Sequence, residues 1–295
     1  MKASYKIAVV GSASFLAKHF IRAAQTIKPA SKILLLDRSQ CDITDKGQLK
    51  EVFESINVDY VVNFAGISTV TGSDSTKIYN TNAFGQANLL EALKNSKFRG
   101  RHLFVSSANI YGSRERTFLE SDEGMPQNHY ACSKMLGEKY CDWYKDEFDI
   151  VIARPFNCVG AGQQTKFLVP KLVQAFANGD AEIRLGNLGI QRDFVDARDA
   201  VSILFSILHH GERGGVYNVS NNQTNSIQEL ISILELVSGC SPDIRSVPEF
   251  CRSNDLMFQC GDNTLSRGLG YERRFTIEET LNWMLSAVAA RTDES

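Results

Sequence analysis

Lys6–Ile27, KIAVVGSASFLAKHFIRAAQTI, joins an apolar run to a helical pattern at Gly11. The first part is apolar at nearly every position, whereas hydrophobic residues in the second part recur at the spacing of a helix face. The alternation continues through KILLLD, YVVNFAG, HLFVSSA and DIVIARP, each separated from the next by a helical segment. Apolar strands separated by helices indicate a parallel sheet covered on both faces. With right-handed crossovers, the predicted fold is α/β and doubly wound.

The pattern of the chain changes after RPFN at residues 154–157. The helical segment LVPKLVQAFANG is followed by shorter, mixed segments, and a last helix starts near TIEETLNWML. We expect a doubly wound (Rossmann) domain at 1–165, with a return segment at about 194–220. Residues 166–193 and 221–295 are expected to form a smaller C-terminal α/β lobe that seats the substrate. No Pro- or Gly-rich linker is present, so the two parts are expected to share one continuous core.

Composition and charge exclude several classes of function. The 295-residue chain has 43% hydrophobic and 22% charged residues and a net charge of -2, which offers no basic surface for nucleic acid. The N-terminus MKASYKIAVVG is too weakly apolar for a signal peptide and no segment approaches a membrane span, so we expect no membrane partner and a cytoplasmic location. The 7 Cys form no CxxC pair and the 5 His are dispersed, which predicts reduced thiols and no metal site.

The turn GSASFLA follows the first strand, where a dinucleotide-binding fold places its phosphate turn. The N-terminus of the following helix would offer unpaired N–H groups and a positive dipole end to a pyrophosphate. The usual motif has three glycines; Gly11 is kept, and Ser14 and Ala17 replace the other two. Each replacement adds a Cβ where close approach is needed, so the turn is compatible with a cofactor or with a plain β–α connection.

An acidic residue at the end of the second strand bears on the choice of cofactor. Asp37 stands where a carboxylate accepts hydrogen bonds from the adenosine ribose, although it could also be a solvated strand-end acid. Arg38 follows, and its guanidinium could hold a 2′-phosphate. Asp37 therefore favours NAD(H) while Arg38 tolerates NADP(H), and both stay open. Asp42, in CDITD, is either a helix N-cap or an adenine contact.

Three residues suit the reduction of a ketone, which needs hydride at carbon and a proton at oxygen. Tyr130 and Lys134, in YACSK, are spaced so that a helix places the phenol and the ammonium on one face. The ammonium would stabilise the phenolate and lower the pKa of Tyr130 from its ordinary value of about 10. Ser107 ends the strand HLFVSSA, at the edge where open α/β sheets bind ligands, and its hydroxyl could hold the substrate oxygen.

These residues resemble the extended short-chain dehydrogenase/reductase family, and the resemblance covers nearly the whole chain. Its motifs occur in the family's order, as NFAGIS, NTNAFGQANLLEAL, VSSANIYG, YACSK, RPFNCVGAG, QRDFVDARD and GVYNVS. The resemblance implies that Ser107, Tyr130 and Lys134 are catalytic, that Asn82 supports the cofactor loop and that Pro155 abuts the nicotinamide. The residues expected to bind NAD(H) or NADP(H) are Gly11, Ser14, Phe15, Leu16, Asp37, Arg38, Asp42, Ile43, Phe64, Ala65, Gly66, Asn82, Tyr130, Lys134 and Pro155.

The second half resembles the nucleotide-sugar branch of this family, especially the GDP-4-keto-6-deoxymannose reductases. The matching segments are RPFNCVGAGQ, FLVPKLV, RLGNLGIQRDFVDARD and CRSNDLMFQCGDNTLSRGLGY. By that match Asn157, Arg192 and Arg252 hold a nucleotide diphosphate, whose oxygens suit bidentate guanidinium groups. Either arginine could instead form a salt bridge, which for Arg192 would involve Asp193 or Asp196. The residues expected to bind a nucleotide-diphosphate sugar are Ser68, Ser107, Asn109, Asn157, Arg192 and Arg252.

Some positions depart from the patterns of related enzymes. Ala108 and Asn109 follow the catalytic serine where sugar 4,6-dehydratases carry an acidic residue, so dehydration is not expected. Asn109 and Phe167 stand where the fucose-synthesising epimerase-reductases use a Cys and a His, which argues against double inversion. Cys158 replaces a His of many reductases and Ala161 a common Pro, which leaves the identity of the sugar open.

The leading hypothesis is an NAD(P)H-dependent reductase of a 4-keto-6-deoxy nucleotide sugar, with Tyr130 as proton donor. An NAD-dependent nucleotide-sugar 4-epimerase needs the same three residues but retains its NAD; Ser14 and Ala17 slightly favour an exchangeable cofactor and hence the reductase. A non-catalytic dinucleotide sensor is a third hypothesis, which the complete catalytic set disfavours. The resemblance also implies a homodimer formed through helices near residues 76–96 and 130–147.

Overall fold

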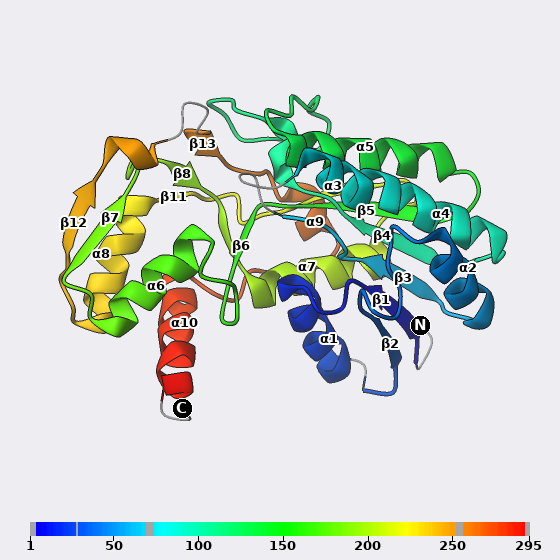
Figure 1. The fold of residues 1–295 in the computed structure, drawn as a ribbon, viewed down its shortest axis with the longest axis horizontal. Helices are drawn as coiled ribbons and strands as arrows, with labels where there is room; N and C mark the ends of the chain where they lie inside the picture. The colour runs from blue at the N-terminus through cyan, green and yellow to red at the C-terminus, as the bar shows by residue number, and fades with distance from the viewer. Residues whose placement is uncertain (1–3, 28, 69–73, 252–255, 293–295) are drawn as a thin grey trace.

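The apolar runs form a six-stranded parallel sheet in the order β10-β5-β4-β3-β1-β2, with helices on both faces (Figure 1). The computed structural model describes residues 4–27, 29–68, 74–251 and 256–292. The prediction of a doubly wound parallel sheet is confirmed. Its strands are β1 (Lys6–Val10), β2 (Lys32–Leu36), β3 (Tyr60–Asn63), β4 (Arg101–Val105), β5 (Asp149–Pro155) and β10 (Val216–Val219).

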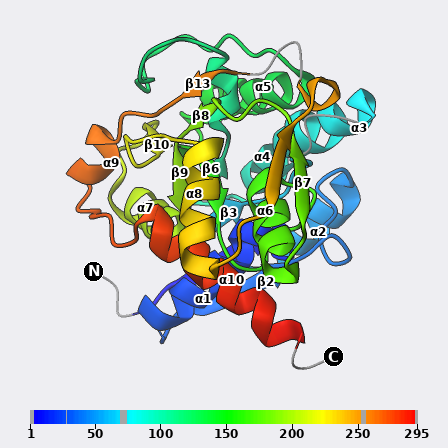
Figure 2. The same ribbon diagram turned by 90° about the vertical axis from the view of Figure 1, so that its left-hand side faces the viewer.

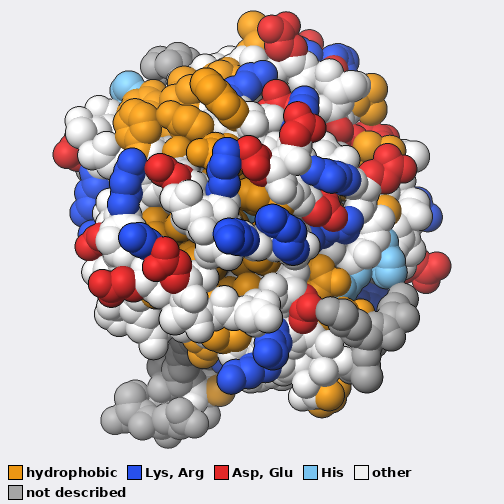
Figure 3. All heavy atoms as spheres, turned by 90° about the vertical axis from the view of Figure 1, so that its right-hand side faces the viewer, with side chains coloured by type: hydrophobic (Ala, Val, Ile, Leu, Met, Phe, Trp, Pro, Cys, Tyr) orange, Lys and Arg blue, Asp and Glu red, His pale blue; other side chains and the backbone are white. Residues whose placement is uncertain are grey.

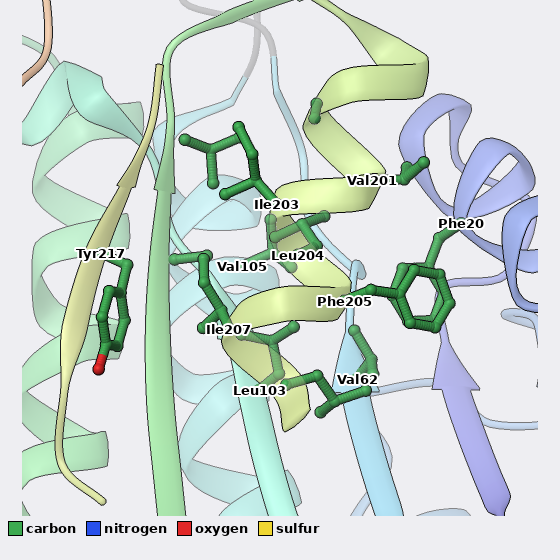
Figure 4. Close-up of a cluster of buried hydrophobic side chains, with 14 of the residues drawn as sticks. Phe20, Val62, Leu103, Val105, Val201, Ile203, Leu204, Phe205, Ile207 and Tyr217 are labelled. Carbon is green, nitrogen blue, oxygen red and sulfur yellow. The ribbon is translucent and has the colours of Figure 1, made fainter. Parts of the chain in front are cut away.

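Each face of the sheet has its own hydrophobic core. One face packs against α1 (Phe15–Ile27) and α7 (Ala197–His210), and the other against α2 (Lys46–Ser55), α4 (Gly85–Asn95) and α5 (His129–Tyr144). Because successive strand residues point to opposite faces, Val9 belongs to the first core and Val10 to the second. In the first core the rings of Phe20 and Phe205 stack with centroids 4.2 Å apart (Figure 4). This packing holds the carboxyl ends of the strands in place.

The long helix predicted near residues 77–96 contains a π-helical segment. α3 (Ser75–Tyr79) continues through the π segment η1 (Asn80–Phe84) into α4. A π segment inserts an extra residue into a helical turn and is often found at functional sites. Asn82 lies within it and is buried. The extra residue shifts the helix face on which the following side chains lie. Helical periodicity in the sequence does not predict this shift.

A smaller lobe of helices and short strands follows β5. Three of its helices, α6, α8 and α10, pack together, as Figure 2 shows. None of the described helices has both the length and the apolar character needed to cross a membrane. The elements of this part are β6 (Asn157–Val159), α6 (Leu168–Asn178), β7 (Glu182–Leu185), β8 (Gln191–Arg192), β9 (Phe194–Asp196), β11 (Asn225–Ser226), α8 (Ile227–Ser238), β12 (Asp243–Ser246), η3 (Pro248–Phe250), β13 (Phe258–Gln259), α9 (Thr264–Gly268) and α10 (Ile277–Thr292).

The expectation of one continuous core is wrong. The smaller lobe has a hydrophobic cluster of its own, formed mainly by α6, α8 and α10. The parallel pair β6 and β9 joins it to the main sheet. Their neighbouring residues alternate between clusters: Val195 belongs to the core under α7, whereas Phe194 belongs to that of the smaller lobe. The lobes are thus distinct in packing but connected by paired strands rather than by a linker.

A buried ion pair fastens α5 to β5. Arg154 donates from Nε and Nη2 to the two carboxylate oxygens of Glu138, at 3.0 and 2.7 Å. Its Nη1 also donates to Tyr111 Oη and to the carbonyl of Glu120, both at 2.9 Å. Tyr111 belongs to the 3₁₀ segment η2 (Ala108–Tyr111) that follows β4. Both charged side chains are nearly buried and have lost most of their hydration. The attraction between them offsets the free-energy cost of that loss.

We expect Glu138→Ala to reduce the free energy of unfolding by about 3–5 kcal/mol, because Arg154 would stay buried without its counter-charge. The matched control is Glu147→Ala, which removes the partner of Lys94 in an exposed pair and should change the free energy of unfolding far less, because water screens exposed charges. Urea unfolding followed by circular dichroism measures both. Equal effects of the two substitutions would contradict this account of the Arg154 pair.

Candidate active site

A cavity of about 790 Å³ opens at the carboxyl ends of the central strands and extends to the smaller lobe. Thirteen of the residues selected from the sequence line it: Ser14, Phe15, Leu16, Phe64, Gly66, Ser68, Ser107, Asn109, Tyr130, Lys134, Pro155, Asn157 and Arg192. Those that do not line it are Gly11, Asp37, Arg38, Asp42, Ile43, Ala65 and Asn82. Arg252 lies outside the described residues.

The three candidate catalytic residues meet in this cavity. Ser107 follows β4 and its Oγ accepts a hydrogen bond from Asn109 N at 3.2 Å. Tyr130 lies in the first turn of α5, which is capped by Asn128, and Ser107 is near enough to its phenol to act on the pKa of that group. Lys134 follows one turn later, and its Nζ donates to the carbonyl of Val105 at 2.8 Å. The end of β4 and the start of α5 therefore bring the Ser107 hydroxyl, the Tyr130 phenol and the Lys134 ammonium into one cavity.

Burial dominates the acidities of these groups. It lowers the pKa of Lys134 to about 8, against a small opposing effect of Glu138. Burial also raises the pKa of Tyr130, and the hydrogen bond from Ser107 offsets this only in part. The expected lowering of the Tyr130 pKa by Lys134 is therefore wrong for the protein alone, because the ammonium binds a main-chain carbonyl and the phenol lies in a desolvated site.

The phosphate turn has the geometry that a dinucleotide requires. Gly11 has φ +73°, and a Cβ there would lie 2.5 Å from the backbone nitrogen of Ala65, so only glycine fits between β1 and the loop after β3. Ser14 precedes α1, and its buried Oγ has no hydrogen-bond partner among the described residues. Because the hydroxyl lines the cavity beside a helix N-terminus, the turn fits a bound phosphate group.

Asn82 fixes the loop after β3. Its Oδ1 accepts from Ile67 N at 2.7 Å, and its Nδ2 donates to Ile67 O and to Ser133 Oγ, both at 3.0 Å. A Cβ on Gly66 would approach Asn82 Oδ1 to 3.1 Å and Lys134 Nζ to 3.3 Å. Asn82 therefore lies behind the cavity wall and joins this loop to α5.

The end of β2 is already organised by local hydrogen bonds. Asp37 Oδ1 accepts from the backbone and hydroxyl of Ser39, which lowers the pKa of Asp37. Arg38 forms an exposed ion pair with Asp42 at 2.9 Å. Asp42 is not the N-cap of α2, because Asp45 caps that helix. The structure thus removes one of the two interpretations of Asp42 and keeps NAD(H) and NADP(H) both compatible with this edge.

The opposite end of the cavity contains Asn157 and Arg192. Asn157 Nδ2 donates to Asp193 O at 3.3 Å and to Gln259 Oε1 at 3.2 Å. The carboxylate of Asp193 accepts from the backbone amides of residues 221, 222 and 261, and burial raises its pKa to about 7. Asp196 forms an ion pair with Arg198 at 2.7 Å. Both acids suggested as partners of Arg192 thus make other strong contacts.

Much of the cavity wall was not selected from the sequence. It comes from the turn before α6, from α6 itself, from the residues at and after the end of β7 and from η3, and includes Gln163, Lys166, Leu168, Asn187 and Phe250. FLVPKLV and RLGN mark these segments in the sequence, but they contain no catalytic residue pattern. Only the packing of the smaller lobe turns them toward the cavity.

The sheet, the phosphate turn and the catalytic set define an NAD(P)-binding enzyme of the short-chain dehydrogenase/reductase type. The model of the NAD dependent epimerase/dehydratase family matches residues 7–220. The chain belongs to this family, and its cofactor is therefore NAD(H) or NADP(H).

Relatives of known name match almost the whole chain. GDP-6-deoxy-D-mannose reductase of Pseudomonas aeruginosa is 30% identical over 305 residues, covering 98% of this chain and 99% of that protein. GDP-6-deoxy-D-talose 4-dehydrogenase of Aggregatibacter actinomycetemcomitans is 30% identical over 274 residues, covering 92% and 93%. The structure of RMD from Pseudomonas aeruginosa complexed with NADPH has a TM-score of 0.88 at 27% identity and covers 98% of each chain.

We expect the affinity for NADH to fall above a pH of about 8 if the Lys134 ammonium holds the cofactor. Burial gives the free protein a Lys134 pKa of about 8, so the cation needed for binding is lost above that pH. The Kd should then rise about tenfold per pH unit. Titration of NADH fluorescence between pH 6.5 and 9.5 measures this. Lys134→Met should bind weakly at every pH, and a Met variant with the wild-type pH dependence would refute the assignment.

Proposed function

We propose that the protein reduces a 4-keto-6-deoxy nucleotide sugar with NADH or NADPH, and that Tyr130 donates the proton. The observation that carries the proposal is the meeting of Tyr130, Ser107 and Lys134 in one cavity. Both full-length relatives described above carry names of enzymes of GDP-linked 6-deoxy sugars. A cavity of about 790 Å³ is also of the size that binds extended small molecules.

The residues divide the reduction between them. Bound nicotinamide supplies the hydride. Tyr130 gives its phenolic proton to the carbonyl oxygen, and the raised pKa of the buried phenol keeps that proton available at neutral pH. Ser107 lines the same cavity as Tyr130, and its hydroxyl binds the same carbonyl oxygen. Lys134 brings positive charge that favours the phenolate left behind, provided that it keeps its proton on cofactor binding.

The proposed binding of the nucleotide diphosphate rests on Arg192 and Asn157. Arg192 is on β8 and lines the cavity. In the sequence it lies far from Ser107 and Tyr130. A guanidinium there suits the diphosphate, which carries charge between the nucleoside and the sugar. Asn157 lines the same cavity as Arg192, and its amide suits a contact to the diphosphate or the sugar.

Two residues after β4 argue against dehydration. Ala108 is buried and has no ionisable group, and Asn109 donates its backbone amide to Ser107 Oγ. The side chain of Asn109 lies 3.5 Å from Gln259 Nε2. Loss of water from the sugar needs a general acid at this position. We therefore favour reduction, although dTDP-D-glucose 4,6-dehydratases occur among the relatives at 25% identity.

We expect Tyr130→Phe to lower kcat by about 10²–10⁴-fold and to leave cofactor binding intact, because only the proton donor is removed. The assay is a panel of GDP-, dTDP-, UDP- and CDP-linked 4-keto-6-deoxy sugars, with loss of NADH or NADPH absorbance and product stereochemistry as readouts. Tyr140→Phe, a half-buried tyrosine on the same helix but outside the cavity, is the matched control. Full turnover by Tyr130→Phe would refute the assignment.

Unmodified UDP-sugars, assayed beside this panel, separate the reductase from the 4-epimerase. A 4-epimerase interconverts unmodified nucleotide sugars without net consumption of NADH or NADPH and retains bound NAD through purification. Turnover of UDP-sugars with no absorbance loss would therefore replace the proposed reaction by epimerisation. If the protein turned over neither class of substrate but kept its full function in the cell, the dinucleotide sensor would be favoured.

The proposal includes a homodimer in the cytoplasm. Apolar side chains gather on the molecular face shown in Figure 3, and exposed Phe84, Leu136 and Trp143 come from η1 and α5. All cysteines are free, in keeping with a reducing compartment. Exposed apolar patches of this kind are typical of association surfaces.

We expect Trp143→Glu to convert the dimer to a monomer, because a charge would be buried in the apolar contact. Sedimentation velocity measures the change in mass. Leu236→Glu is the matched control, since Leu236 is as exposed (77% against 82% for Trp143) but lies on α8 in the smaller lobe. Identical masses for the Trp143 variant and the wild type would exclude this helix from the interface.

A further inference from the structure

Gln163 presents an unused hydrogen-bond acceptor in the cavity. It lies in the turn between β6 and α6, and its Nε2 donates to the carbonyl of Cys158 at 3.0 Å. This bond fixes the orientation of the amide, because the reversed amide would place two carbonyl oxygens in contact. Oε1 therefore points away from Cys158, where it is buried and has no hydrogen-bond partner among the described residues. A buried acceptor of this kind is costly unless a ligand supplies the donor.

The turn that carries Gln163 is held rigidly. Gln163 N donates to Gly160 O at 3.3 Å, and His19 Nε2 contacts the carbonyl of Ala161 at 3.0 Å. A Cβ on Gly160 would lie 2.9 Å from the ring of Trp283, so the turn packs directly against α10. The acceptor is thus positioned before any ligand binds, which favours a specific contact.

The turn that carries Gln163 borders the same cavity as the candidate catalytic residues and the start of α1. The Cys158 thiol lies close enough to Tyr130 to contribute to the raised pKa of the phenol. On the other side, His19 belongs to α1 and packs edge-to-face against Phe15 with ring centroids 4.9 Å apart. Phe15 also lines the cavity at the start of α1, beside the phosphate turn. Gln163 therefore lines the same cavity as the phenol of Tyr130 and the start of α1.

We propose that Gln163 Oε1 accepts a hydrogen bond from the carboxamide NH₂ of the nicotinamide and makes the enzyme selective for cofactors that have this group. A carbonyl oxygen accepts from any N–H or O–H donor, and the carboxamide NH₂ is a donor that NAD(P) carries on the reacting ring itself. The inference rests on the use of NAD(P), which family membership establishes, and not on the proposed sugar substrate. Loss of the contact would weaken binding without removing any catalytic group.

The first test uses the unchanged protein and three oxidised cofactors. The thionicotinamide analogue of NAD keeps the N–H donors, whereas the 3-acetylpyridine analogue has a methyl group in their place. Isothermal titration calorimetry should give similar Kd values for NAD and the thionicotinamide analogue, and a Kd about tenfold higher for the acetylpyridine analogue. Equal affinities for all three would overturn the proposal.

The second test is Gln163→Met, which keeps the length of the side chain and removes the acceptor. This variant should bind NAD and the acetylpyridine analogue alike, both about tenfold more weakly than the wild type binds NAD. Gln164→Met is the matched control, because Gln164 is exposed and outside the cavity lining, and it should retain the wild-type discrimination. Thermal unfolding checks that both variants are folded.

Retained discrimination in a folded Gln163→Met variant would overturn the proposal. So would an unchanged NAD affinity with a raised KM for the sugar, because the acceptor would then serve a sugar hydroxyl. Calorimetry needs no substrate, so a failure of the proposed reductase reaction would leave these results interpretable. The two proposals can therefore fail separately.

Discussion

The buried ammonium of Lys134, held by the carbonyl of Val105, is the contact on which the arrangement of the active site depends. It joins α5 to the end of β4 and so sets where Tyr130 stands relative to Ser107. The side chain is only 6% exposed, and the fall of its pKa to about 8 measures how strongly the site disfavours an unpaired charge. A ligand that offers hydroxyl or phosphate oxygens would stabilise the charged form of Lys134. The desolvation that lowers the pKa of Lys134 in the protein alone therefore favours ligand binding.

Parallel strands explain why residues far apart in the chain reach one cavity. All strands of the large sheet end on the same side, and the loops after β1, β3, β4 and β5 therefore supply Ser14, Gly66, Ser107 and Pro155 to one edge. The smaller lobe closes the opposite side of the cavity through α6 and β8. Because β6 and β9 pair directly between the lobes, the substrate end is positioned by main-chain contacts rather than by a linker.

The sequence predicts the fold and the meeting of Ser107, Tyr130 and Lys134 in one cavity because both depend on local patterns. Apolar runs between helices specify the sheet, and YACSK specifies one helix face. The pKa of Tyr130 could not be predicted, since it depends on burial by segments distant in sequence. The separate core of the smaller lobe and the π segment at Asn82 depend on packing, and hydrophobic periodicity does not encode them. Gln163 has no catalytic pattern at all; only the three-dimensional position of its unsatisfied oxygen marks it.

Some buried polar atoms without a partner among the described residues lie in the cavity, where a ligand could satisfy them, whereas Asp149 Oδ1 and Asn221 Oδ1 are unsatisfied outside it. Ser14 Oγ, Ser106 Oγ and Gln163 Oε1 are buried without protein partners among the described residues, and all three residues line the cavity. Each such group costs about 1–3 kcal/mol until a ligand satisfies it. The structure therefore changes the interpretation of Ser14, which in the sequence counted against phosphate binding. Its Cβ departs from the glycine of the usual phosphate turn, but its hydroxyl adds a hydrogen-bond donor that glycine lacks, so the replacement is compatible with phosphate binding.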